Sequence, residues 1–259
     1  MEKRPYLQKV YCYVQYECIE LLFYERRRRI MERRELKSSA KEQLGGRWCL
    51  TIAALVISGM IGSVISAVIG LLTPGLGIIV SLCIQGIVEF GIVTYSLNVV
   101  RDNDARFTDI FDGFSSHIIL KAIVLGIIVT VSVAAGLMIF IIPGIIIGLM
   151  FSQSFFILFD NPELTPIECI KASAEMMRGH KWECFVLYLS FIGWAILIVI
   201  ISTAFIWGSF VVISPTLTTI LFVLGVVVST VMGLFLSSYI LITFANYYVE
   251  LRAINDIIM

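Results

Sequence analysis

Six long apolar segments limit what this chain can fold into more than any other feature. They cover residues 49–72, 76–100, 118–142, 144–159, 184–206 and 217–246. A helix needs roughly 20 apolar residues to cross the hydrocarbon core of a bilayer. Five segments have that length, and the fourth reaches it by using part of 139–142. The sequence therefore predicts an all-α, polytopic membrane protein with six transmembrane helices.

The connections between these segments predict how the helices pair. TPGLG at 73–77 and IPG at 142–144 are turn sequences, and 207–216 is a longer connection without charge. We expect three hairpins, each preceded by an amphipathic helix on the inner membrane surface. Residues 31–259 then form a single membrane domain built from the units 31–100, 101–159 and 160–259.

Positive charge is distributed very unevenly. Twelve of the nineteen Lys and Arg precede Cys49, and the positive charges of the loops fall in 101–117, 160–183 and the C-terminus. Lys and Arg in short loops stay on the cytoplasmic side of a membrane. All these segments lie on one side of a six-helix arrangement. We therefore expect a multi-pass membrane protein with both termini in the cytoplasm.

The segment NPELTPIECIKASAEMMRGHKW predicts a short amphipathic helix between two spans. Thr165 and Glu168 have the spacing of a capping box, and Gly179 follows the helix as a stop. Such a helix favours the membrane surface, with a solvent-facing loop helix as the alternative. The residues expected at that surface are Ile167, Ile170, Lys171, Met177, Lys181 and Trp182.

A related pattern occurs earlier in the chain. LKSSAKEQLGGRW at 36–48 aligns without gaps to IKASAEMMRGHKW at 170–182, pairing Gly45 with Gly179 and Trp48 with Trp182. Both segments precede a predicted span, which is typical of an internal repeat. Chance similarity between two basic amphipathic helices is the alternative. ARFTDIFDGFSSH at 105–117 is a weaker third copy.

Small residues recur every four positions in the first and last spans. In lipid, such rows let helix backbones approach closely, so they predict helix-packing faces or a dimer interface, with a substrate groove as the alternative. The residues are Ser58, Gly62, Ser66, Gly70, Gly225, Ser229, Gly233 and Ser237.

The second span carries Ser81, Gln85 and Glu89 on one face, and Glu89 is an acid deep inside an apolar segment. Ionisable residues in a membrane usually face a cavity or a partner. These three residues, with Gln153, are a candidate intramembrane polar site. Three interpretations stay open: a protonated Glu89 that holds helices together, a proton- or cation-coupled site, and a contact with lipid or a partner.

Sequence motifs of enzymes are absent. The chain contains no GxSxG, HExxH, P-loop or dinucleotide-binding pattern, and its cysteines and two histidines form no metal-ligand spacing. We expect a non-enzymatic protein without metal, cofactor or nucleic-acid partner. Its expected contacts are the lipid bilayer and a membrane-protein partner or second copy. The preferred function is a lipid-organising or partner-docking envelope protein; the alternative is a small transporter or channel that uses Glu89.

The segments IMERRELKSSAKEQLGGRW and IIPGIIIGLMFSQSFFILFDNPELTPIECIKASAEMMRGHKWECFVLYLSFIGW closely resemble a bacterial family of six-span membrane proteins, domain of unknown function 975. The resemblance extends from Glu32 to about the C-terminus. It implies a cytoplasmic-membrane protein without an assigned activity. It supplies no catalytic residues.

Residues 1–30 lie outside that resemblance. In ERRRRIMERRELK, consecutive arginines precede Met31. Two arginine codons can read AGG-AGG, which is the purine-rich ribosome-binding sequence that bacteria place just upstream of a start codon. We therefore hypothesise that translation starts at Met31 and that residues 1–30 are an extension created by the choice of start site.

Overall fold

The computed structural model describes residues 33–72, 77–101, 105–211 and 214–258, and every regular element in these ranges is a helix. The hypothesis about residues 1–30 lies outside them. In chain order the elements are α2 (Arg33–Gln43), α3 (Trp48–Leu72), α4 (Gly77–Val100), the 3-10 helix η1 (Phe107–Phe114), α5 (Ile119–Ile139), α6 (Ile141–Phe151), α7 (Ser154–Asp160), α8 (Pro166–Met176), α9 (Lys181–Val211) and α10 (Pro215–Ile258).

Six helical stretches are long and apolar enough to cross a membrane, which confirms the predicted number of spans. The fourth, Ile141–Asp160, is divided into α6 and α7. The last helix is much longer than the predicted 217–246, because no Gly or Pro follows Ala245 to end it. With 44 residues, α10 is about 66 Å long, roughly twice the thickness of a hydrocarbon core.

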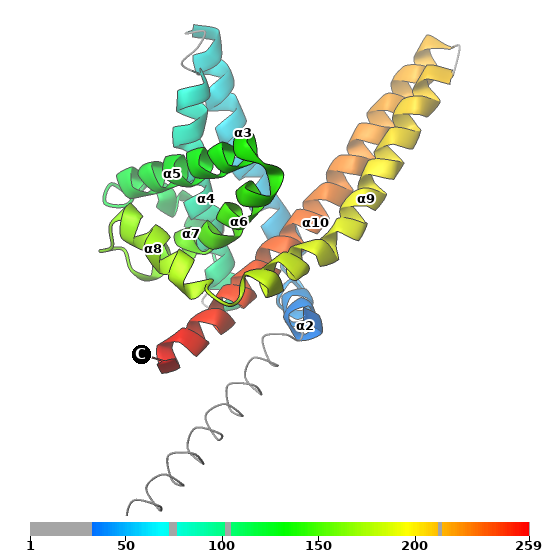
Figure 1. Cartoon of the computed structure of the whole chain (residues 1–259). Coiled ribbons are helices and arrows are strands. Elements are labelled where there is room, and N and C mark those ends of the chain that lie inside the picture. Colours follow the sequence, from blue (N-terminus) through cyan, green and yellow to red (C-terminus); the bar gives the residue numbers. More distant parts are fainter. Residues whose placement is uncertain (1–32, 73–76, 102–104, 212–213, 259) are drawn as a thin grey trace, which may run out of the picture.

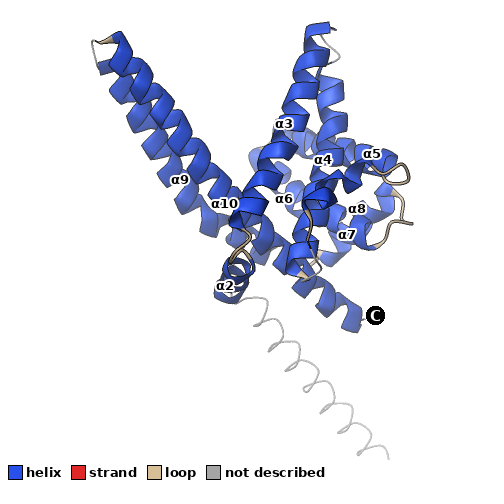
Figure 2. Ribbon diagram, turned by 180° about the vertical axis from the view of Figure 1, so that it is seen from behind, coloured by secondary structure: helices blue, strands red, loops and turns tan. Residues whose placement is uncertain are grey.

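Two helix pairs diverge from a common base (Figure 1). We call α3 with α4 the first arm, and α9 with α10 the second arm. Helices α5 to α8 lie beside the lower part of the first arm, and α2 lies at the base (Figure 2). The base contains α2, η1, α8, the loops around 101, 161 and 178, and the last turns of α10. We call it the charged end, because the Lys and Arg residues of the described chain lie there. Residues 49–100, 122–159 and 184–249, which form most of the long apolar helices, contain no Lys or Arg.

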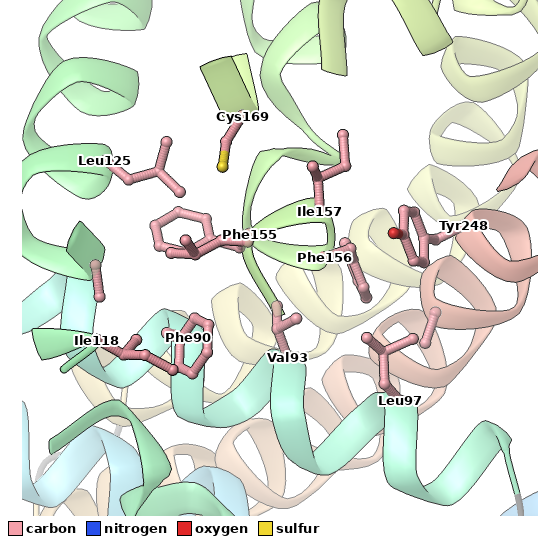
Figure 3. Packing of buried hydrophobic residues seen from close by; sticks show 13 residues of the cluster. Phe90, Val93, Leu97, Ile118, Leu125, Phe155, Phe156, Ile157, Cys169 and Tyr248 are labelled. Atoms are coloured by element: carbon pink, nitrogen blue, oxygen red, sulfur yellow. The ribbon is translucent and has the colours of Figure 1, made fainter. Parts of the chain in front are cut away.

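Buried side chains gather near the charged end, while the arms expose apolar residues along their length. Helix α4 is central: it packs against α3, α5, α7, α10 and η1. Its residues Phe90, Val93 and Leu97 join a cluster with side chains of α5, α7, α8 and α10 (Figure 3). In that cluster the Phe156 and Tyr248 rings stack with centroids 5.0 Å apart. The buried apolar area holds α4 and α7 against α10.

Helices α4 and α5 cross at two glycines. A Cβ built on Gly126 would lie 2.6 Å from the Cα of Gly86, and one built on Gly86 would collide with the Ala122 carbonyl. Only hydrogen atoms fit between these backbones, so both positions require glycine. This close crossing was missing from the sequence prediction, which looked for rows of small residues in single helices.

The predicted small-residue rows are packing faces only in part. Gly225 lies against Phe205, where an added Cβ would be 2.5 Å from the Phe205 Cβ, and the Ser229 and Ser202 hydroxyls are 2.6 Å apart. Gly233 has open space beside it and Ser237 is exposed, because the second arm has no helix on that face. In α3, Ser58 is buried and Gly62 and Ser66 are half-buried. The surroundings of Gly70 lie outside the described part of the chain.

We expect Gly126→Ala to destabilise the fold by about 1–3 kcal/mol, because the methyl group would push α5 away from α4. Thermal unfolding in detergent measures the effect. Gly193→Ala is the matched control, since nothing lies within 4 Å of its Cβ position. An unchanged unfolding temperature for Gly126→Ala would contradict the close crossing.

Candidate functional site

The polar face of α4 is open rather than packed. Gln85 and Glu89 are exposed and Ser81 is half-buried. An acidic side chain of a stretch that is apolar enough to cross a membrane is therefore exposed on the surface of the described chain.

Gln153 does not join this face. It is buried at the break between α6 and α7, where its backbone N–H donates to the Ser173 hydroxyl at 3.2 Å and its side-chain amide donates to the Ser152 hydroxyl at 3.0 Å. No hydrogen bond within the described ranges links Glu89 to Gln85, Gln153, Ser152 or Ser154. Within the described ranges, the structure thus gives no hydrogen bond through which Glu89 would link two helices.

The break in the fourth span is stabilised from outside it. The Ser173 hydroxyl on α8 donates to the Met150 carbonyl at 2.7 Å while it accepts from Gln153, so one side chain serves a carbonyl of α6 and an N–H group at the start of α7. The buried oxygen Oε1 of Gln153 and hydroxyl of Ser154 have no partner in the described chain. Helix breaks within a membrane are tolerated where such groups supply the missing backbone contacts.

A buried carboxylate organises the charged end. Asp160, whose side chain is 5% exposed, receives two hydrogen bonds from the Arg101 guanidinium, at 2.6 and 2.8 Å. The Tyr248 hydroxyl donates to it at 2.8 Å, and Arg252 forms a second ion pair with it. The contacts join the end of α4 to the end of α7 and to α10. The hydrogen bond to Asp160 is the main reason why the pKa of Arg101 is raised above its ordinary value.

Asp160 was not among the residues predicted from the sequence to form a site. A usable signal was present: Arg101, Asp160 and Arg252 each lie at the charged border of an apolar segment, at the same membrane side. Groups at equal depth on neighbouring spans can pair, and pairing makes partial burial of the charges tolerable.

Helix α8 begins as predicted but turns most of its apolar face toward the protein. Thr165 and Glu168 form the capping box, and hydrogen bonds from the Thr165 backbone and hydroxyl hold the pKa of Glu168 below its ordinary value. Met177 is completely buried and Ile170 packs against the core. Met177 therefore does not reach a membrane surface, contrary to expectation. Among the predicted surface residues, Ile167, Lys171 and Trp182 are exposed, and Lys181 is half-buried.

The two similar segments have similar local structures, but their register differs by one residue from the sequence alignment. The positive-φ glycines are Gly46, with φ 80°, and Gly179, with φ 90°. The long helices that follow begin at Trp48 and at Lys181. The buried faces are Leu36, Ala40 and Leu44 in and directly after α2, and Cys169, Ser173 and Met177 in and directly after α8. Gly46, rather than Gly45, is therefore the counterpart of Gly179.

The described residues hold no cluster of three or more His, Cys, Asp and Glu side chains that could bind a metal ion. Burial is the main cause that raises the pKa of the Cys169 thiol to about 11, so this thiol stays protonated near neutral pH.

Together, the six apolar helices and the paired charges at one end define a multi-pass helical membrane protein. The sequence profile of the family described as "Protein of unknown function (DUF975)" matches residues 31–140 and 127–255, and the chain belongs to this family. No curated protein and no solved structure matches the chain.

We expect Asp160→Asn to destabilise the protein by about 2–3 kcal/mol, because two partly buried arginines would lose their counter-charge. The expected loss is smaller than that for a fully buried ion pair, because both arginines are partly exposed to solvent. Unfolding by heat or denaturant in detergent measures the change. Asp112→Asn removes a charge from an exposed position and serves as the control. Equal stability of the two variants would argue against an organising role for Asp160.

Proposed function

We propose that the protein is a non-enzymatic, lipid-organising protein of a bacterial cytoplasmic membrane, with the charged end and both termini facing the cytoplasm. One observation carries the proposal: the short helices η1, α2 and α8 and the start of α9 expose large apolar side chains as well as basic ones. Phe111, Phe114, Ile167 and Trp182 are exposed on η1, on α8 and at the start of α9. Exposed basic residues on α2 and around α8 are Arg34, Lys41, Lys171 and Arg178.

This mixture suits the boundary between lipid headgroups and acyl chains. Aromatic residues favour that depth, and each Lys or Arg near an anionic leaflet contributes about 1 kcal/mol of attraction. The opposite faces of α2 and α8 are buried against the bundle, so these helices are held in position at the interface. A partner-docking function would use the same exposed side chains, and the measurement below distinguishes the two.

We expect the protein in bilayers to restrict spin-labelled phosphatidylglycerol more than spin-labelled phosphatidylcholine, with a preference of roughly threefold or more. Electron spin resonance measures the two restricted fractions. Lys171→Gln/Arg178→Gln should lower the preference, because it removes two exposed charges. Thr230→Val, on an exposed face of the second arm, should leave it unchanged. Equal restriction of both lipids by the wild-type protein would refute lipid organisation and favour a protein partner.

A second candidate function, proton- or cation-coupled transport, is favoured by one specific observation: Glu89 is exposed within an apolar stretch and lacks a hydrogen bond within the described chain. A carboxylic acid in this position can exchange a proton with water that enters between the arms.

If Glu89 carries transport, Glu89→Gln should abolish a pH-dependent ion flux in proteoliposomes, because an amide does not titrate. Gln85→Leu changes a neighbouring exposed polar residue and should leave the pH dependence in place. Proteoliposomes without any flux in the wild-type protein would remove this candidate.

A further inference from the structure

A pocket of about 530 Å³ lies where α2 and the start of α3 meet the second arm. Figure 2 shows α2 at the base, below α10 and the start of α3. The volume is within the range of roughly 300–1,000 Å³ that is usual for small-ligand sites. Its walls come from two consecutive helices near the start of the described chain, α2 and α3, and from its last two helices, α9 and α10. They carry basic groups at one end and apolar groups at the other.

The basic end consists of Lys37 and Lys41, one helical turn apart on the same face of α2. Leu36, Ala40 and Leu44 on the adjoining face are buried and fix the rotation of the helix. The Tyr239 hydroxyl donates to the Lys37 carbonyl at 3.2 Å and ties α2 to α10. The two ammonium groups are therefore directed to the pocket by a helix that is itself firmly packed.

Lys37 is held at the rim. Its ammonium lies 4.2 Å from the centre of the Phe191 ring and donates to the Ser190 carbonyl at 3.4 Å. Lys41 is exposed. Both lysines line the pocket, so its basic end carries two ammonium groups.

The apolar end follows the second arm away from the lysines. Trp194 and Ile198 are one turn apart on α9, and Val231 and Phe235 are one turn apart on α10. The Trp48 ring packs against the Phe235 ring with centroids 5.4 Å apart. From Tyr239 to Val231, α10 rises about 12 Å. This wall belongs to stretches that are apolar enough to cross a membrane, where the surrounding solvent is lipid.

We propose that this pocket binds one anionic phospholipid of the surrounding membrane. Its phosphate lies between Lys37 and Lys41, and one acyl chain lies against Ile198, Val231 and Phe235. Charge complementarity selects an anionic headgroup, and the apolar wall selects a chain. The inference rests on the proposed function, because both require an anionic leaflet at the charged end. It adds one defined binding site for a single lipid molecule to the general preference for anionic lipids.

The test uses the full chain purified in a mild detergent and titrated with dioleoyl phosphatidylglycerol or dioleoyl phosphatidylcholine. Native mass spectrometry counts the bound lipids. We expect the first phosphatidylglycerol to bind at least about tenfold more tightly than the first phosphatidylcholine, and Lys37→Gln/Lys41→Gln to lose at least about tenfold of that affinity. The matched control Lys171→Gln/Arg178→Gln removes the same charge at the same end and should retain the first lipid.

Two further variants keep the test decisive if the double variant folds poorly. Lys41→Gln changes only an exposed side chain and should weaken the first phosphatidylglycerol about fivefold. Ile198→Trp fills the apolar end, leaves both lysines in place, and should abolish the tight first site. Unchanged binding in Ile198→Trp would overturn the proposal.

If both double variants lose the same affinity for the first phosphatidylglycerol, the binding depends on net charge alone. That result would overturn the proposed lipid site in the pocket and leave the proposed function intact. A first phosphatidylglycerol that depends on Lys37 and Lys41, in a protein with no lipid preference in the spin-label experiment, would support the pocket and refute the proposed function.

Discussion

The ion pairs of Asp160 are the interaction on which the arrangement of helices most depends. Apolar helices in lipid gain little hydrophobic free energy from contact with one another, so polar contacts and close packing decide how they meet. Asp160 binds Arg101 at the end of α4 and both Tyr248 and Arg252 on α10. One carboxylate thus joins the central helix to the second arm. Nearby, the Lys121 ammonium donates to the Pro162 carbonyl at 2.5 Å and secures the following loop.

Close packing supplies the second constraint. The crossing of Gly86 with Gly126 brings two backbones together, and the cluster around Phe90 and Phe156 fills the space between that crossing and α10. Away from these contacts the two arms separate, and their outer residues are exposed and apolar. The molecule therefore combines a tightly packed base with two arms whose surfaces suit lipid. The lysine pocket lies where α2 and the start of α3 meet the second arm.

Much of this fold could be predicted from the sequence. The six spans and the capping box at Thr165 depend on local pattern, and the structure contains them. Features that depend on which helices become neighbours could not be predicted. Gly86 and Gly126 need two separate helices to cross, and Asp160 needs partners from two others. The end of α10 was misplaced because low hydropathy ends a span without ending a helix.

The candidate sites show the same limit. Glu89 and Gln153 were predicted to belong to one polar site, but one lies on an open face and the other at a buried helix break. The periodicity of α8 identified an apolar face at Ile170 and Met177, but periodicity cannot distinguish lipid from protein as the covering surface. The lysine pocket combines side chains from α2, α3, α9 and α10, and no single segment carries its pattern.

The length of α10 has a mechanical consequence. Tyr239 in the pocket wall and Arg252 at the Asp160 carboxylate lie on one uninterrupted helix, about 20 Å apart along its axis. The segment from Tyr239 to Arg252 contains no proline or glycine, so this part of α10 is stiff and does not bend freely. A tilt of this segment must therefore displace Arg252 from Asp160 or carry α4 and α7 with it. The helix acts as a lever that connects the membrane-embedded wall to the ionic anchor.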